Sequence, residues 1–295
     1  MENVSSTSMN TGMRHEYYKH SGMFNPMGVI VILAIGAVGT VILSLIYSYA
    51  THYIPFVYLN ILLTILFGVG VGALAGIGGI FFKIRNISII GLISGLLGLF
   101  AEYCQWVFDI LALTDGEFFL LNPVDIYGFI RVIGVTGVWS IRRFTPTGAV
   151  LYAVWFGEAA IIIGASLLIA IYMIKTKPFC ERCDKWVTKE ETLFPLNYAD
   201  DVNGLKLKLE QGDFSALTSL GKAELNSNHY TKVTLKHCEQ CKDLYLLSAW
   251  SIMVNKNKKD ALETKSWEIV YHLIIDENVY NYLMEWNRSS LNSMF

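Results

Sequence analysis

Four long runs of apolar residues dominate the first 174 positions of the chain. They cover residues 27–50, 55–82, 87–111 and 149–174. Each run is long enough to cross a hydrocarbon core of about 30 Å, which takes about 20 residues in a helix. The first two contain no charged side chain, and a water-exposed helix has no reason to stay apolar on every face over that length. The pattern predicts an α-helical integral membrane bundle of four transmembrane helices over residues 27–174.

The segments on either side of this pattern predict two further features of the bundle. Residues 1–26 are polar and predict an N-terminal tail, and the apolar run after them is too long for a signal peptide. Residues 112–148 are too apolar for a free loop, so we expect them to be embedded. Asn122, Pro123 and Asp125 are typical of a helix start and predict a short interfacial helix from about Pro123 to Ile133. That helix is either a lid over the bundle or a packed surface segment.

The pattern changes after residue 175. The segments "HYTKVTLKHC" and "LYLLSAWSIMV" are typical of strands, and in "SWEIVYHLIID" every second residue from Trp267 to Ile275 is apolar. Asp213, followed by "FSALTSL" and Gly221, predicts a short capped helix, and "DENVYNYLMEW" predicts a terminal helix. Residues 175–295 are therefore expected to form a small α+β domain.

Composition and charge support this division. The chain is 53% hydrophobic and only 16% charged, against about 25% charged in an average soluble protein. Most of its 23 lysines and arginines and 25 acidic residues follow residue 175. Basic residues near the ends of membrane spans favour the cytosolic side. The basic residues at the span ends are Arg14, Lys19, Lys83, Arg85, Lys175 and Lys177. They predict a multi-pass protein of the cell (inner or plasma) membrane with both termini in the cytosol. Three basic residues of the third connection argue against this orientation: Arg131, Arg142 and Arg143.

Four cysteines give the clearest chemical signal in the sequence. Cys180 and Cys183 form one CxxC pair, and Cys238 and Cys241 form another. Each such gap turns two sulfurs toward one ion, and two pairs complete a tetrahedron. The segment between them, residues 184–237, is much longer than the roughly 15–20 residues of a compact site.

These residues resemble a zinc ribbon with an insertion between its two CxxC turns, and the resemblance covers only this part of the chain. It implies a structural zinc ion, because a site closed by four cysteines folds a domain and does not catalyse. Iron is less favoured because glycine does not follow either pair, and the absence of a shared metal is the third alternative. A c-type haem would require histidine where Asp184 and Lys242 stand. A disulfide is disfavoured on the predicted cytosolic side.

Glycines in the second run suggest helix packing. Gly70, Gly72 and Ala75 have the spacing of a dinucleotide-binding motif, but they lie inside an uncharged span and not in a strand-to-helix turn. Gly68, Gly72 and Gly76 fall on one side of a helix and would let a neighbouring backbone approach closely.

Carboxylates interrupt the last two runs. Glu102, Gln105 and Asp109 fall in one stripe of the third span, together with Gly91, Gly95 and Gly98, so we expect them to face protein and not lipid. Glu158 in the fourth span lies at a similar depth, roughly 12 to 14 Å below the outer surface at about 1.5 Å per residue, so Glu102 and Glu158 are placed to meet. The acids would share a proton, bind a cation, or join the two helices.

Two functions fit these features. The first is a membrane protein that anchors a cytosolic zinc-binding interaction or regulatory domain, with a cytosolic protein partner and a possible homo-oligomer. The nearly balanced charge after residue 175 predicts no nucleic-acid partner. The alternative is a small channel or a proton- or cation-coupled transporter that uses the intramembrane carboxylates. No known catalytic motif is found, which disfavours an enzyme.

Overall fold

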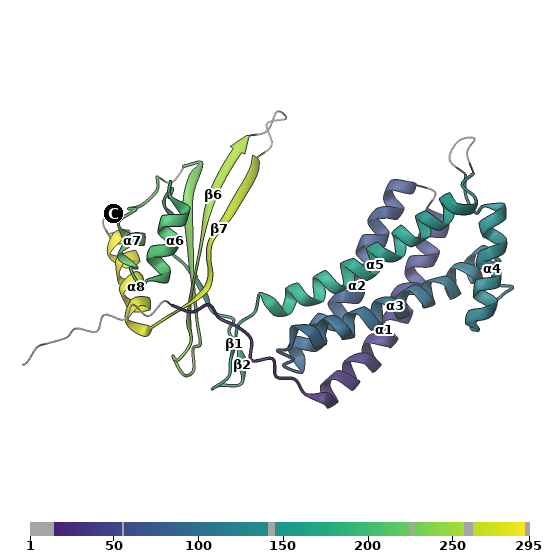
Figure 1. Ribbon diagram of the computed structural model, residues 1–295, viewed down its shortest axis with the longest axis horizontal. Helices are drawn as coiled ribbons and strands as arrows, with labels where there is room; N and C mark the ends of the chain where they lie inside the picture. Colours follow the sequence, from purple (N-terminus) through teal and green to yellow (C-terminus); the bar gives the residue numbers. More distant parts are fainter. Residues whose placement is uncertain (1–14, 55, 141–144, 225–226, 257–261, 293–295) are drawn as a thin grey trace, which may run out of the picture. The chain divides into compact units, whose positions relative to one another are not determined.

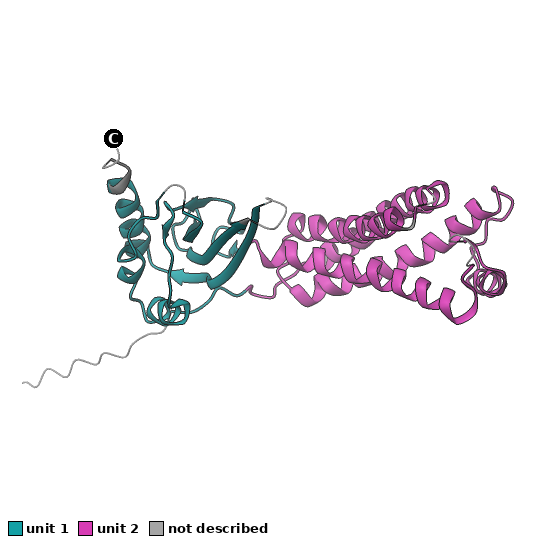
Figure 2. Ribbon diagram, turned by 90° about the horizontal axis from the view of Figure 1, so that it is seen from above, with its two compact units in different colours: residues 1–19, 178–295 teal, residues 20–177 magenta. Residues whose placement is uncertain are grey.

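The structure, a computed structural model, describes residues 15–54, 56–140, 145–224, 227–256 and 262–292. The chain divides into two compact units (Figures 1 and 2). Residues 20–177 form one, called here the helical unit, and residues 1–19 and 178–295 form the other, called the sheet unit. Arg14, Arg142 and Arg143, which entered the predicted orientation, lie outside the described residues.

Each predicted apolar run corresponds to one long helix of the helical unit. These helices are α1 (Pro26–Tyr53), α2 (Val57–Phe81), α3 (Ile87–Leu113) and α5 (Gly148–Lys175). All four are long and apolar enough to cross a membrane, by length and composition. The predicted ends differ from the observed ones by a few residues, which is the usual uncertainty at helix termini.

Close backbone contact between α2 and α5 depends on glycine. A Cβ atom added at Gly72 would lie 2.4 Å from the carbonyl oxygen of Ser166, and one added at Gly68 would lie 2.7 Å from that of Ile162. Side chains at these positions would push the two helices apart, so the predicted packing role of the glycine face is confirmed.

Helix α3 also turns its glycines toward α5. An added Cβ at Gly98 would lie 2.8 Å from the hydroxyl of Ser166, and Gly91 and Gly95 face Ile171 and Leu167. On its other side α3 packs against α1, where Ser44 and Ser48 donate hydrogen bonds to backbone carbonyls of α3. The glycines of the predicted stripe therefore lie against α5, inside the bundle.

The predicted short helix is α4 (Pro123–Thr136), which extends a little beyond the expected end. The side chain of Asn122 accepts a hydrogen bond from the Val124 amide at 3.0 Å, so the helix start is confirmed. Its buried Ile126 packs against Val107 and Ile110 near the end of α3. Helix α4 thus covers the end of the bundle at which α3 ends and α5 begins, called here the loop end. A position in a membrane interface stays a prediction.

The sheet unit contains an antiparallel sheet with strand order β3–β5–β6–β7, in which β4 also pairs with β5. A separate hairpin joins β1 and β2. In chain order the elements are β1 (Phe179–Cys180), β2 (Lys185–Trp186), β3 (Glu190–Thr192), β4 (Leu196–Asn197), α6 (Val202–Glu210), α7 (Ser215–Thr218), β5 (His229–His237), β6 (Tyr245–Lys256), β7 (Leu262–Ile275) and α8 (Glu277–Asn292).

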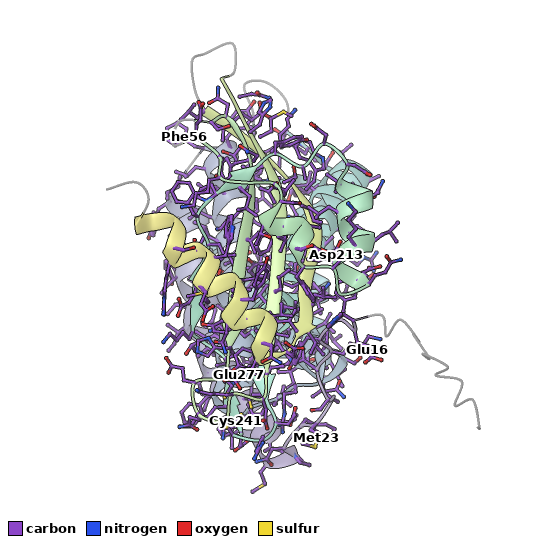
Figure 3. All side chains as sticks on the ribbon, turned by 90° about the vertical axis from the view of Figure 1, so that its left-hand side faces the viewer. Glu16, Met23, Phe56, Asp213, Cys241 and Glu277 are labelled. Carbon is purple, nitrogen blue, oxygen red and sulfur yellow. The ribbon has the colours of Figure 1, made fainter. Side chains whose placement is uncertain are left out.

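Helices α6, α7 and α8 lie on one side of the sheet (Figures 1 and 3) and enclose its apolar core. The strands and the terminal helix occur where the pattern predicted them. The helix expected after Asp213 is only the single turn α7, and no side chain caps it. Helix α6 was missed, although the buried Leu205 and Leu209 have the four-residue spacing of a helix face.

The predicted alternation in β7 fails in its middle. The pairing of β6 with β7 shifts twice between Leu247 and Trp250, so β7 contains bulges. In this part of β7, His272 has a φ of 53°. Val270, two residues before His272, is buried in the core together with Ile269. A bulge adds a residue to one strand and reverses the faces of the residues around it. Val270 therefore takes the core position that strict alternation assigned to Tyr271.

A segment of the predicted N-terminal tail forms part of the sheet unit. Tyr17 pairs with Leu273 of β7, and the Tyr18 amide donates to the His272 carbonyl at 2.8 Å. The Tyr17 hydroxyl also donates to the carboxylate of Glu210 at 2.8 Å, and Glu210 is only 2% exposed. The polar composition of residues 1–26 gave no indication of this strand-like segment, which protects an otherwise open sheet edge.

Candidate functional site

The first CxxC pair lies in the β1–β2 hairpin. Cys180 ends β1, and Cys183 lies in the turn that leads to β2. Asp184, which follows Cys183, has a φ of 51°. This left-handed conformation closes the turn and brings the two cysteines to the same side of the hairpin.

The second pair repeats this geometry after β5. The Cys238 amide donates to the Leu244 carbonyl at 3.0 Å, and the Lys242 amide donates to the Cys238 carbonyl at 3.3 Å. Lys242 has a φ of 53°, close to that of Asp184. Two turns of the same form therefore present two pairs of sulfurs.

The fold brings these two pairs together into one group, called here the cysteine cluster. The four Sγ atoms all lie within 4.8 Å of one another, and those of Cys180 and Cys241 are 3.3 Å apart. Four sulfurs at about 2.3 Å from a zinc ion form a tetrahedron with edges of about 3.8 Å, so the cluster fits a tetrahedral metal. All four cysteines are free thiols.

The cluster is closed to further ligands. Cys180 and Cys238 are buried, and Val187 and Leu244 pack around the sulfurs. Among the described residues, no histidine or carboxylate joins the four cysteines. A metal held by such a set has no open position for a substrate, so the arrangement fits a structural site.

Hydrogen bonds distinguish two thiols of the cysteine cluster, Cys238 and Cys183. Burial favours the neutral form of Cys238, but the backbone amides of Cys241 and Gln240 and the neighbouring thiols donate to it and lower its pKa to about 7. The pKa of Cys183 rises to about 12, first because of its hydrogen bond with Cys241 and then through burial. Without a metal, Cys238 is therefore the more readily ionised of these two thiols.

The structure weakens one part of the sequence argument about the metal. Iron was disfavoured because glycine is absent after each CxxC pair. Asp184 and Lys242 nevertheless adopt the positive φ that glycine favours. The absence of glycine therefore does not separate iron from zinc at this site.

Five polar residues of the helical unit form a hydrogen-bonded group, called here the polar cluster: Tyr47, Thr64, Gln105, Asp109 and Glu158. The Gln105 amide donates to Glu158 and to Asp109, at 3.2 Å in both cases. The Tyr47 hydroxyl donates to the same oxygen of Glu158 and lies 2.8 Å from the Thr64 hydroxyl. All four long helices contribute to this cluster.

Glu102 lies apart from the polar cluster in its hydrogen bonding. Its carboxylate accepts a hydrogen bond from the indole of Trp106, one turn along the same helix, at 3.1 Å. Within the part of the chain that the structure describes, no hydrogen bond joins Glu102 to Glu158. Glu158 instead meets Gln105 and Tyr47.

The polar cluster borders a cavity of about 900 Å³ at the loop end, called here the bundle cavity. Asp109 and Glu158 line it, together with Tyr47, His52 and Asn60 from the ends of α1 and α2. Sequence reasoning did not identify these last three residues. A sequence signal existed for Asn60: it and Thr64 are two polar residues one helical turn apart in a span without charge.

No protein-family model, no curated protein and no solved structure matches this chain. The cysteine cluster is compatible with a zinc-ribbon-like site on its own geometry, and no family is recognised.

Proposed function

We propose that this chain is a multi-pass membrane protein that anchors a zinc-organised interaction or regulatory domain on the cytosolic side. The observation that supports the proposal is the convergence of four cysteines from two distant segments into one closed cluster. A closed tetrathiolate site contributes folding free energy and supplies no catalytic position. The domain therefore acts through its surface and not through its metal.

The proposed metal would have a structural role in the sheet unit. The main core lies between the sheet and helices α6, α7 and α8, and it includes none of the cysteines. Around the cluster, the apolar contacts come from a few residues, chiefly Val187 and Leu244. An ion pair between Arg182 and Asp243 also links the two turns, but both side chains are exposed and such pairs contribute little. A bound ion would hold the β1–β2 hairpin to the end of β5.

The N-terminal segment supports the proposed topology. Tyr17 and Tyr18 precede α1, and they pair with β7, which follows α5. This pairing supports an arrangement in which both ends of the bundle emerge on one side of the membrane, as an even number of crossings would require. The flanking basic residues favour the cytosol for that side. That compartment keeps thiols reduced and available for metal.

A protein partner is the proposed target of this domain. The end of the β6–β7 hairpin extends beyond β5 (Figure 1). Strand β7 also has exposed apolar side chains, with Leu262 70% and Trp267 44% exposed. Exposed apolar and aromatic residues are typical of protein interaction surfaces. A second copy of the chain is the other proposed partner.

Metal analysis of the purified full-length protein tests the central proposal. We expect one equivalent of zinc and a colourless protein. One equivalent of iron with visible thiolate-to-iron absorption would keep the closed site but replace zinc, and no metal after purification without chelators would contradict the proposal. Isolation of the protein from its native membrane should recover a stoichiometric protein partner.

The bundle cavity favours a second candidate function, a small channel or a proton- or cation-coupled transporter. Two carboxylates line this cavity inside a predicted membrane domain, and such groups often mark ion pathways. Purified protein in liposomes should then show proton or cation flux that Glu158→Gln abolishes while assembly is retained. Loss of assembly in this variant would instead assign the polar cluster to helix packing.

A further inference from the structure

The bundle cavity has the dimensions of a binding site for an organic molecule. Its volume of about 900 Å³ lies within the range of roughly 300–1,000 Å³ that is typical of small-molecule sites. The ends of α1 and α3, the beginnings of α2 and α5, and residues 133–140 surround it. An inorganic cation would leave most of this space unfilled.

The polar groups of the lining favour a positively charged ligand. Asp109 and Glu158 are its acidic groups, and His52 is the only basic side chain among the described lining residues. The carbonyl oxygen of the Asn60 side chain is buried and has no hydrogen-bond partner among the described residues. The described lining therefore carries two carboxylates and one histidine, and a carboxylate at membrane depth is costly unless a cation or a proton neutralises it.

The carboxylates are also fixed in position. Gln105, which is 3% exposed, donates to both of them, and the Tyr47 hydroxyl donates to Glu158. The Tyr47 ring stacks on Phe67 with 4.6 Å between ring centroids, so the donor itself is held by packing. A site whose charged groups are held before binding loses little conformational entropy when the ligand enters.

Aromatic rings supply the rest of the chemistry. Trp106, Trp139 and Trp155 line the cavity, and the rings of Trp106 and Trp155 meet edge to face with 5.1 Å between centroids. Indole faces attract ammonium-type cations through the ring quadrupole and also cover apolar groups. Carboxylates beside several tryptophans are thus suited to a cation with an apolar body.

From these contacts we propose that the bundle cavity binds a hydrophobic organic cation, such as a quaternary ammonium or phosphonium compound, with Asp109 and Glu158 as counter-ions and the tryptophans around its apolar groups. The inference rests on the second candidate function, since it names a ligand class for the same cavity. It requires binding only and makes no use of the cysteine cluster.

Equilibrium binding to the full-length protein in nanodiscs of phosphatidylcholine, a lipid without net charge, tests the inference. The probes are tetraethylammonium, benzyltriethylammonium and tetraphenylphosphonium, with triphenylphosphine oxide as a neutral counterpart. We expect saturable binding of at least one cation with a change in tryptophan fluorescence, and binding of the neutral compound at least about tenfold weaker. No saturable binding of any cation, or equal binding of the neutral compound, would overturn the inference.

Variants locate the site. Glu158→Gln, Asp109→Asn and the double variant should each bind the cation at least about tenfold more weakly. The control is Glu117→Gln, which removes the charge of an exposed acid at the loop end outside the cavity lining; we expect an unchanged affinity. Size-exclusion profiles show which variants are folded. Trp155→Leu leaves both acids in place and tests the contribution of the tryptophans to cation binding. Folded variants that all bind like the unchanged protein would refute the assignment.

Flux measurements separate this inference from the function on which it rests. Cation binding without flux in liposomes would retain the site and remove the transporter. Proton flux without organic-cation binding would retain the pathway and remove the proposed ligand.

Discussion

Cys238 has a different environment from the one cysteine outside the cysteine cluster. Its sulfur lies among the other three sulfurs, whereas Cys104 is buried in α3 of the helical unit. A thiolate at position 238 is one of four bonds to the proposed ion, while Cys104 acts as a small apolar side chain. The two positions therefore allow a matched comparison.

We predict that Cys238→Ser reduces bound zinc from one equivalent to almost none and lowers the thermal stability of the sheet unit, because metal binding and folding are one equilibrium in such sites. Metal analysis and thermal unfolding of the purified protein provide the measurement. Cys104→Ala is the control and should keep its zinc. A Cys238→Ser variant with full metal content and unchanged stability would show that the cluster is not the metal site.

Tyr47 provides a second test at the residue scale. Its hydroxyl donates to Glu158 from a side chain that is 5% exposed. Tyr47→Phe should destabilise the bundle by about 1 to 3 kcal/mol, because the carboxylate loses a buried donor. Thermal unfolding in detergent measures the effect, and Tyr58→Phe, at a side chain that is 91% exposed, is the control. Equal melting temperatures for the two variants would mean that this hydrogen bond does not stabilise the bundle.

At the scale of elements, contact between α2 and α5 depends on backbone atoms that cannot easily move. The Cβ atom of an alanine at position 72 would lie 2.4 Å from the Ser166 carbonyl oxygen, which is far closer than atoms in contact. Among the described residues, no atom outside the surrounding backbone of α5 lies within 4 Å of the corresponding atom at Gly164. The same substitution therefore meets a backbone at one site and open space at the other.

We predict that Gly72→Ala destabilises the helical unit by about 1 to 3 kcal/mol, the usual cost of overpacking. Gly164→Ala should be neutral or slightly stabilising, because alanine favours the helix more than glycine does. Thermal unfolding of both variants in one detergent measures the difference. A melting temperature for Gly72→Ala at or above that of Gly164→Ala would contradict the close approach of α2 and α5.

At the scale of the whole molecule, the four proposed crossings and the pairing of Tyr17 with Leu273 give a testable topology. Asp200, in the sheet unit, and Glu117, at the loop end, are both exposed and suit single cysteine reporters. We expect an impermeant thiol reagent, applied to intact cells, to label Glu117→Cys but not Asp200→Cys. The protein without added cysteines gives the background.

Permeabilised cells provide the control for this labelling, since both reporters should then react. Labelling of Asp200→Cys from outside would reverse the orientation and place the cysteine cluster in an oxidising compartment. Labelling of both reporters in intact cells would contradict an even number of crossings.

The sequence alone determined the local features of this protein. The length of the apolar runs fixes four helices that can cross a membrane, and Asn122 fixes the start of α4, because both depend on neighbouring residues. The CxxC spacing likewise indicates a turn that orients two sulfurs to one side. The resemblance to a zinc ribbon followed from these two turns, and the structure adds that they converge.

Only the tertiary structure decided which distant residues meet. Glu158 pairs with Gln105 and Tyr47 and has no hydrogen bond with Glu102 among the described residues, because the glycine contacts of α2 and α3 set how far each helix is rotated and shifted against α5. The bulges of β7 and its pairing with Tyr17 are also relations between segments far apart in the chain. No local pattern records such relations, since each depends on the position of a partner backbone. The bundle cavity exists for the same reason: it is the space that four helices, packed in this register, leave between them.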